Sequence, residues 1–190
     1  MTRSYGEDMT VHHDYGLELT WSDPSGTNCF NGFSRDFEIT GPRKQSALPG
    51  SAKPRFRGDP TRYSPGELLV AAVASSHMLR FLEVASQVGL VVVDYHDAVG
   101  GTAELSPRGD GEIVEVVLRP TVTVADGPYA NEVKIAMLHH RAQSMSLVGK
   151  SVNLPVKVEP GELVVLNAAE SEMACNTGAH KILSRTAVGA

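Results

Sequence analysis

Cysteine and positive charge are both scarce in this chain of 190 residues. It has two cysteines, Cys29 and Cys175, which lie far apart and form no C-x-x-C pair, so we predict neither a disulfide framework nor a metal site of that type. The seven histidines show no ligand spacing either. Lys and Arg number 17 against 22 Asp and Glu, and this balance excludes the basic surface that nucleic-acid binding requires.

Long apolar runs and targeting signals are also missing. No run reaches the roughly 18 to 20 residues of a membrane span. The N-terminus contains Glu7 and Asp8 and lacks the basic-then-apolar order of a signal peptide. We therefore expect a cytoplasmic protein without membrane contact. A hydrophobic content of 42% over this length is typical of one domain, or one intertwined unit, with a sizeable core.

The pattern of apolar residues predicts an α+β fold with antiparallel strands and two long helices. We expect a frayed segment over residues 1–14, one domain over 15–167 and a loose tail over 168–190. Within the domain, a long surface loop should span 41–63, and Gly100-Gly101 should form a bulge. The predicted strands cover residues 15–21, 30–40, 90–105, 112–125, 152–159 and 163–166.

The first predicted helix has strong signals at both ends. Ser64 can cap it, Pro65 suits its first position, and Glu67 completes a capping box. Gly89 is a typical C-terminal stop. The first half is apolar nearly all round, and about 24 residues would span about 36 Å. Such a helix in a chain of this size suggests packing against a symmetry mate.

The second predicted helix begins near Pro128. Val133, Met137, His140, Ser144 and Leu147 share one face at helical spacing. On that face we expect His140 to be a buried, hydrogen-bonded core residue.

Two segments resemble motifs of the OsmC/Ohr family. Residues 64–79, SPGELLVAAVASSHML, resemble the family's N-P-E-E-L-L-x-A-A-x-x-x-C-H-M-L helix. Residues 142–153, AQSMSLVGKSVN, resemble its A-H-x-x-C-F-I-A-N-S-V-N segment. Residues 33–36, 56–63 and 118–125 resemble further motifs of the OsmC-like subgroup, in the same order. On these residues the chain is identified as a member of that family.

The resemblance implies an intertwined homodimer, with curved sheets around two long central helices. It also implies thiol-dependent reduction of organic hydroperoxides at the dimer interface, by a cysteine pair, an arginine and a glutamate. The cysteine positions are Ser76 and Ser146, and the arginine is Arg35. The glutamate position is Gly66, and a family histidine is replaced by Gln143.

A serine hydroxyl cannot pass through the sulfenate and disulfide states of a thiol peroxidase. We therefore expect no such activity, no cofactor and no metal. The retained interface pocket would bind a small apolar or fatty-acid-like molecule, lined by Met78, Phe81, Met145 and Leu147. An engineered replacement of both cysteines is the simplest alternative to natural loss.

Two enzymatic alternatives stay open. One is a hydroperoxide reductase with a relocated thiol at Cys29, which would face the same side of its predicted strand as Arg35. The other is a weak serine hydrolase at Ser76. His77 is not expected to serve as its base, because consecutive helical residues point about 100° apart. A third possibility is a structural dimer that binds another protein.

Overall fold

The computed structural model describes residues 11–108, 110–167 and 169–170. The chain divides into two compact units, Met1–Pro65 and Gly66–Ala190, and each is described by itself. Cys175, residues 1–10 of the predicted frayed segment and nearly all of the predicted tail over 168–190 lie outside the described residues.

The N-terminal unit contains a small antiparallel sheet with strand order β1-β2-β3. Its strands are β1 (Glu18–Thr20), β2 (Phe37–Thr40) and β3 (Leu48–Gly50), and a 3-10 turn, η1 (Pro54–Phe56), follows them. The expected loop over 41–63 thus contains one strand and one turn. Gly50 is required at the end of β3, because a Cβ there would lie 2.2 Å from the ring of Phe37.

The strand predicted over 30–40 is wrong in its first half, where turns replace it. The Asp23 carboxylate accepts backbone N–H bonds from Ser25 and Ser34, both at 2.8 Å, and so holds residues 23–34 in a folded loop. Cys29 is exposed in this loop, where its carbonyl accepts from the N–H of Gly32. The strand argument that put Cys29 on the same side as Arg35 therefore fails.

Helix α1 (Pro65–Gln87) begins and ends as its sequence predicts. At its C-terminus the N–H of Leu90 donates to the carbonyl of Ala85, and the N–H of Gly89 to that of Ser86. This is a Schellman motif, and Gly89 has the left-handed backbone (φ 76°) that the motif requires. Among the described residues, α1 is long and apolar enough to cross a membrane, contrary to our expectation, although core helices meet the same criterion.

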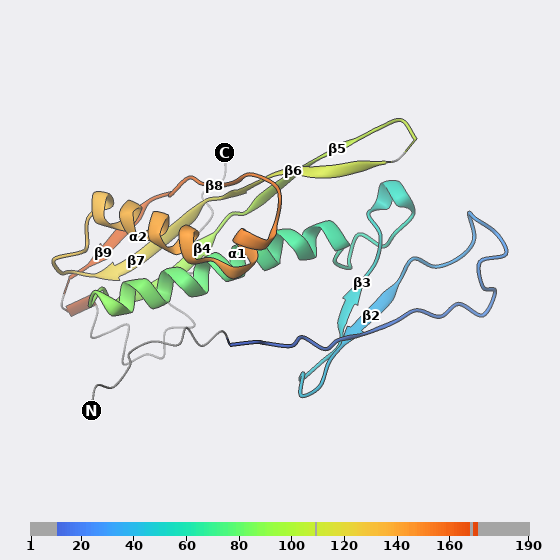
Figure 1. Ribbon diagram of the computed structural model, residues 1–190, viewed down its shortest axis with the longest axis horizontal. Helices are drawn as coiled ribbons and strands as arrows, with labels where there is room; N and C mark the ends of the chain where they lie inside the picture. Colours follow the sequence, from blue (N-terminus) through green and yellow to red (C-terminus); the bar gives the residue numbers. More distant parts are fainter. Residues whose placement is uncertain (1–10, 109, 168, 171–190) are drawn as a thin grey trace, which may run out of the picture. The chain divides into compact units, whose positions relative to one another are not determined.

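The C-terminal unit contains two three-stranded sheets, with orders β4-β7-β9 and β5-β6-β8 (Figure 1). The predicted strands over 90–105 and 112–125 each divide into two, because each chain segment leaves one sheet for the other. The pairs β4–β7 and β5–β6 are antiparallel, and β6–β8 and β7–β9 are parallel. The register between β5 and β6 shifts at Thr102 and Ala103, where Val114 of β6 is the extra residue, and not at Gly100-Gly101. The strands are β4 (Val92–Asp97), β5 (Gly100–Leu105), β6 (Gly111–Leu118), β7 (Pro120–Ala125), β8 (Val156–Val158) and β9 (Leu163–Leu166).

Helix α2 (Glu132–Met145) starts later than expected and buries a different face. Asn131 caps it by accepting a bond from the N–H of Lys134, and a turn occupies residues 127–131. Val133 is 72% exposed and Met137 66%, and His140 is exposed, so the predicted core face is wrong. The buried residues of α2 are Ile135, Leu138, His139 and Ala142. A short helix, α3 (Leu147–Ser151), follows directly.

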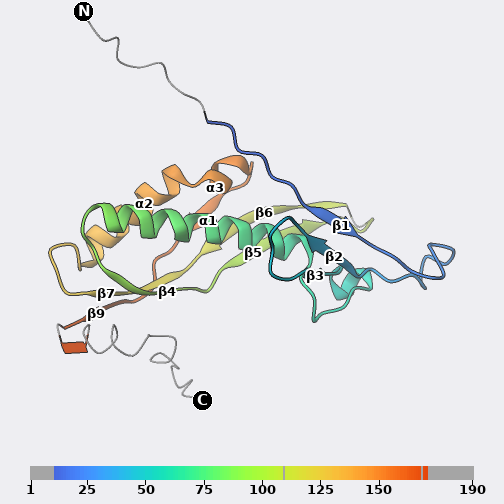
Figure 2. The same cartoon turned by 90° about the horizontal axis from the view of Figure 1, so that it is seen from below.

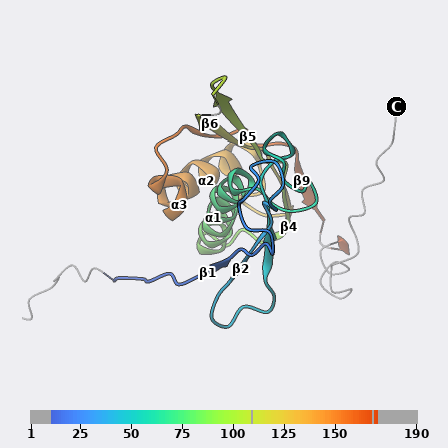
Figure 3. The same ribbon diagram turned by 90° about the vertical axis from the view of Figure 1, so that its right-hand side faces the viewer.

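The core of the C-terminal unit has two parts, one at each end of α1. Phe81 and Val84, from the second half of α1, pack with β4, β7, β9 and α2. Val73, from the first half, packs with β6 and β8. Figures 2 and 3 show α1 and α2 together on one side of the strands. The observed α+β architecture confirms the predicted fold class, although the pairs β6–β8 and β7–β9 are parallel where antiparallel strands were predicted.

Candidate functional site

Ser76 and Ser146 lie together, as the two motifs predict. Their hydroxyl oxygens are 3.0 Å apart, although 70 positions separate the residues in sequence. Ser76 lies on α1 and is partly buried, while Ser146 joins α2 to α3 and is 3% exposed. The fold therefore places the two predicted cysteine positions so close together that cysteines there could form a disulfide after a small adjustment of the side chains.

Backbone N–H groups also donate to both hydroxyls. Val148 donates to Ser76 Oγ at 3.3 Å, and Gly149 donates to Ser146 Oγ at 3.2 Å. Ser146 is thus the N-cap of α3. A Cβ at position 149 would lie 2.9 Å from Ser146 Oγ, so this glycine allows the close approach. Neither serine is hydrogen-bonded to a base among the described residues.

Gly66 and Gln143 occupy the positions at which the motif resemblance predicts a glutamate and a histidine. Gly66 brings no carboxylate to the start of α1. Gln143 has a structural contact, because its Nε2 donates to the carbonyl of Val156 at 2.6 Å and so ties α2 to β8. Its Oε1 is buried and has no partner among the described residues. In this position Gln143 anchors the end of α2 that leads into Ser146.

Arg35 belongs to the N-terminal unit, and its guanidinium is held there. It donates to the carbonyls of Phe33 and Phe30, and it lies 3.5 Å from the centroid of the Phe33 ring. The Arg57 guanidinium lies 4.9 Å from the Phe30 ring centroid, so guanidinium groups and aromatic rings pack against one another in turn. The predicted role of Arg35 in a site with the serine pair stays a prediction.

Beside the serine pair lies a buried histidine pair that the sequence reasoning missed. His77 Nε2 and His139 Nδ1 are 3.1 Å apart, and the two rings stack with a centroid distance of 5.3 Å. Each residue is 1% exposed. Burial lowers the pKa of His77 to about 4 and, together with the charge of His77, that of His139 to about 3. Both rings are therefore neutral at pH 7.

The helical spacing of apolar residues in the sequence does indicate that these two histidines are buried. His77 lies four residues after Val73 and four before Phe81, in the apolar stripe that α1 buries. His139 lies four residues after Ile135 on α2. The position of each histidine in a buried stripe would have predicted two core rings, and His139 also stacks on Phe81 at 4.1 Å.

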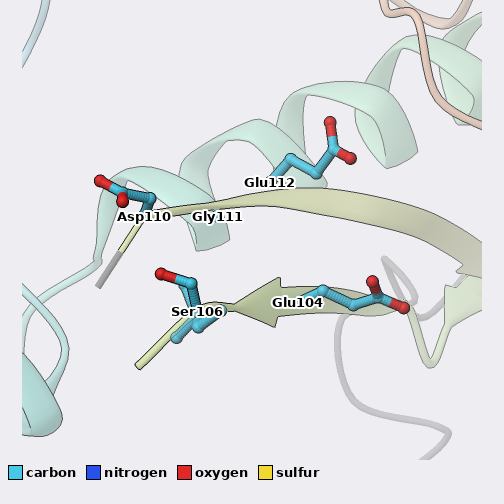
Figure 4. A pocket seen from close by; sticks show the side chains of 6 residues that line it. Glu104, Ser106, Asp110, Gly111 and Glu112 are labelled. Atoms are coloured by element: carbon cyan, nitrogen blue, oxygen red, sulfur yellow. The ribbon is translucent and has the colours of Figure 1, made fainter. Parts of the chain in front are cut away.

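A separate open pocket lies at the tip of the β5–β6 hairpin (Figure 4). None of the predicted site residues belongs to it. It is lined by Glu104, Leu105, Ser106, Asp110, Gly111 and Glu112. Its three carboxylates disfavour anionic ligands. Among the described residues, no group of three or more His, Cys, Asp or Glu could hold a metal ion.

A family profile described as "OsmC-like protein" matches residues 58–160, which is more than half of the chain and includes the serine pair. The chain belongs to the OsmC-like family. No curated protein matches the sequence of this OsmC-like chain. The resemblance that the sequence motifs indicated is therefore confirmed at the level of the family.

Solved structures share the OsmC fold over most of the chain. An OsmC-like protein of unknown function from Vibrio cholerae is 26% identical, with a TM-score of 0.70, and the match covers 79% of this chain and 100% of that one. An OsmC-like protein from Mycoplasma pneumoniae is 13% identical, with a TM-score of 0.62, over 80% and 99% of the two chains. An organic hydroperoxide resistance protein from Elizabethkingia anophelis is 11% identical, with a TM-score of 0.58, over 81% and 99%.

Proposed function

We propose that this OsmC-like protein is a cytoplasmic homodimer that has lost thiol peroxidase chemistry and binds a small apolar ligand beside Ser76. The observation that carries the proposal is the 3.0 Å contact between Ser76 Oγ and Ser146 Oγ, at the two positions that the family motifs assign to redox cysteines. The scaffold that would bring two thiols together is retained, and neither side chain contains sulfur.

The chemistry of the hydroxyl group supports the loss of activity. Peroxide reduction needs a nucleophile that accepts oxygen as a sulfenic acid and then closes a disulfide. An alcohol does neither, and Ser76 has only Ser146 and the Val148 N–H as hydrogen-bond partners among the described residues. Gly66 and Gln143 remove two further groups of the family site, which favours natural divergence over two engineered changes.

Apolar side chains near the serine pair support the ligand class and the dimer. Met145 and Leu147 flank Ser146 and are both exposed, and Leu79 on α1 is 63% exposed. A second protomer or an apolar ligand would cover such surface. Phe81 does not contribute, contrary to our expectation, because it is fully buried against His139.

The direct test compares the natural chain with a variant in which the thiols are restored. Purified protein is incubated with cumene hydroperoxide or linoleate hydroperoxide and a dithiol or lipoyl reductant. We expect no turnover by the natural chain, and measurable turnover by Ser76→Cys/Ser146→Cys if the pocket still admits the hydroperoxide. Turnover by the natural chain that persists after Cys29→Ser/Cys175→Ser contradicts the proposal.

The ligand and the dimer have their own measurement. Native mass spectrometry of the freshly purified protein should show a dimer that carries a small hydrophobic molecule. Leu147→Glu should weaken retention of that molecule, whereas Leu105→Glu, on the exposed β5–β6 hairpin, should not. A strictly monomeric protein, or equal retention in both variants, contradicts this part of the proposal.

The relocated-thiol alternative rests on Cys29, which is exposed and therefore open to oxidants. Mass spectrometry after peroxide treatment tests it, because a Cys29 that stays reduced during turnover cannot be the nucleophile. The hydrolase alternative is disfavoured by the position of His77, whose ring is bonded to His139 in the core. Ester hydrolysis that is equal in the natural chain and in Ser76→Ala removes it.

A further inference from the structure

We propose that the His77–His139 pair is a proton-operated latch between α1 and α2: it holds the helices together while both rings are neutral and releases them when the rings take up protons. The latch concerns how the two helices pack and is independent of what the serine pair binds or catalyses.

The hydrogen bond between the two imidazole rings requires that one of the two facing nitrogens act as the acceptor. His77 Nε2 and His139 Nδ1 share one proton across 3.1 Å. A neutral imidazole has one donor and one acceptor nitrogen, whereas both nitrogens of an imidazolium are donors. When both rings are protonated, the two facing nitrogens become donors and the bond between the helices is lost. Two positive charges would also lie in stacked rings whose centroids are 5.3 Å apart.

Among the described residues, the side chains seen against the two rings are apolar or neutral. Phe81 of α1 stacks on His139, and the apolar cluster that contains Phe81 also includes Leu138 of α2, Val122 and Val124 of β7 and Leu163 of β9. The facing polar residue is Tyr95 of β4, whose ring centroid lies 6.4 Å from that of His139. Burial raises the pKa of Tyr95, so its hydroxyl stays neutral.

The acidic group that interacts with Tyr95 is equally unsuited. Asp97 of β4 interacts with Tyr95, and burial raises the pKa of the Asp97 carboxyl, so acid tends to neutralise it. Of the other charged groups on the helices, Arg80 pairs with Glu83, Arg141 donates to Gln87, and Lys134 donates to the carbonyl of Pro128. Glu67, Glu132 and Lys150 are exposed. His96 and His140 are exposed.

The pH window follows from the direction of the histidine shifts. Folding lowers the pKa of His77 to about 4 and that of His139 to about 3, from the ordinary value of 6.5. An open state, with both rings in water, therefore binds more protons than the closed state over this range. The closed state is at its most stable above pH 6.5 and loses stability as the pH falls towards 4 and 3.

Separation of α1 from α2 would also disrupt the serine pair. Ser76 precedes His77 on α1, and Ser146 follows the helix that carries His139. Separation of the two helices at the rings would therefore break the bond between Ser76 Oγ and Ser146 Oγ. The latch thus couples proton uptake in the core to access at the candidate site.

Hydrogen exchange measured by mass spectrometry tests the latch. After correction for intrinsic rates, exchange of α2 amides in the natural protein should rise at least about tenfold between pH 7 and pH 4.5. The exposed-site control His140→Leu should behave in the same way. The double variant His77→Leu/His139→Leu should lose most of this pH dependence. A flat profile in the natural protein, or the same rise in the double variant, overturns the proposal.

A measurement on the natural protein keeps the proposal testable if the double variant does not fold. Ring ¹⁵N resonances of the histidines report protonation directly. We expect the His77 and His139 rings to stay neutral down to about pH 5 and then to titrate together with the opening of α2. Either ring titrating near pH 6.5, while the α2 amides stay protected, overturns the latch.

Discussion

Two polar pairs join α1 to the α2–α3 segment at neighbouring positions, yet their surroundings differ sharply. In the serine pair each hydroxyl also accepts a backbone N–H bond, and Ser76 is partly exposed. In the histidine pair both rings are buried, and His77 Nδ1 and His139 Nε2 have no partner among the described residues. One pair is well supplied with hydrogen bonds, and the other is not.

This difference shows how one helix serves two purposes at adjacent positions. Consecutive residues on a helix point about 100° apart, so Ser76 reaches the junction of α2 and α3 while His77 enters the core. A change at the serine position leaves the core packing intact. A change at the histidine position alters packing between α1, α2 and β4. We therefore expect that substitutions at Ser76 can change the chemistry of the site with little effect on the free energy of unfolding, whereas substitutions at His77 lower that free energy.

The largest effect is expected from His139→Ala. It removes the ring that stacks on Phe81, leaves a cavity, and deprives His77 Nε2 of its partner. A loss of about 3 to 4 kcal/mol in the free energy of unfolding is expected. Urea unfolding at pH 7 measures it. A loss below about 1 kcal/mol would mean that the stacked pair is not part of the stable core.

A disulfide across the serine pair should have nearly as large an effect, in the opposite direction. Ser76→Cys/Ser146→Cys, made together with Cys29→Ser/Cys175→Ser, should oxidise spontaneously because the side chains already meet. The bond should stabilise the fold by about 2 to 4 kcal/mol. Urea unfolding with and without a reductant checks this value. Failure to form the bond in the folded protein would contradict the geometry of the pair.

Single serine deletions should have smaller effects. Ser146→Ala removes the cap of α3 and the partner of Ser76, at about 1.5 kcal/mol. Ser76→Ala loses the hydroxyl contact with Ser146 and the long Val148 N–H bond, but Ser146 still caps α3 through the Gly149 N–H, so it should cost less, at about 0.5 to 1 kcal/mol. Thermal unfolding of the two variants side by side gives their order. The reverse order would show that α3 does not depend on its cap.

The smallest effect is expected at the histidine next in sequence to the pair. His140 is exposed, and no interaction of its side chain is seen among the described residues. His140→Ala should change the free energy of unfolding by less than about 0.5 kcal/mol. Comparison with His139→Ala in the same urea experiment separates a core ring from a surface ring. Equal losses would place the buried face of α2 elsewhere.

Local signals in the sequence predicted the ends of α1 and the meeting of the two serines. Pro65 and Gly89 have intrinsic backbone preferences that need no tertiary contact. The motifs around Ser76 and Ser146 come from a family whose fold brings them together. Both predictions thus depend on information contained in short segments.

Non-local pairing was the part that the sequence could not supply. The division of each long strand near Val99 and Arg119 depends on partners elsewhere in the chain, which periodicity does not record. Helix α2 has apolar residues on two faces, and the choice between Met137 and Leu138 depends on what the sheet covers. The first half of the strand predicted over 30–40 is a loop because Asp23 accepts a backbone bond from Ser34, a contact that alternation does not reveal.

The parallel pairing of the last strands has a consequence for synthesis of the protein. Strand β9 pairs with β7, Leu163 opposite Val122, and β8 pairs with β6, so both sheets are completed by residues that follow α2. During synthesis on the ribosome, the apolar faces of α1 and of the central strands stay incompletely covered until residues up to Leu166 have emerged. Such long-range closure slows folding and prolongs exposure to aggregation. We therefore expect a nascent chain that ends before β8 to require chaperone protection.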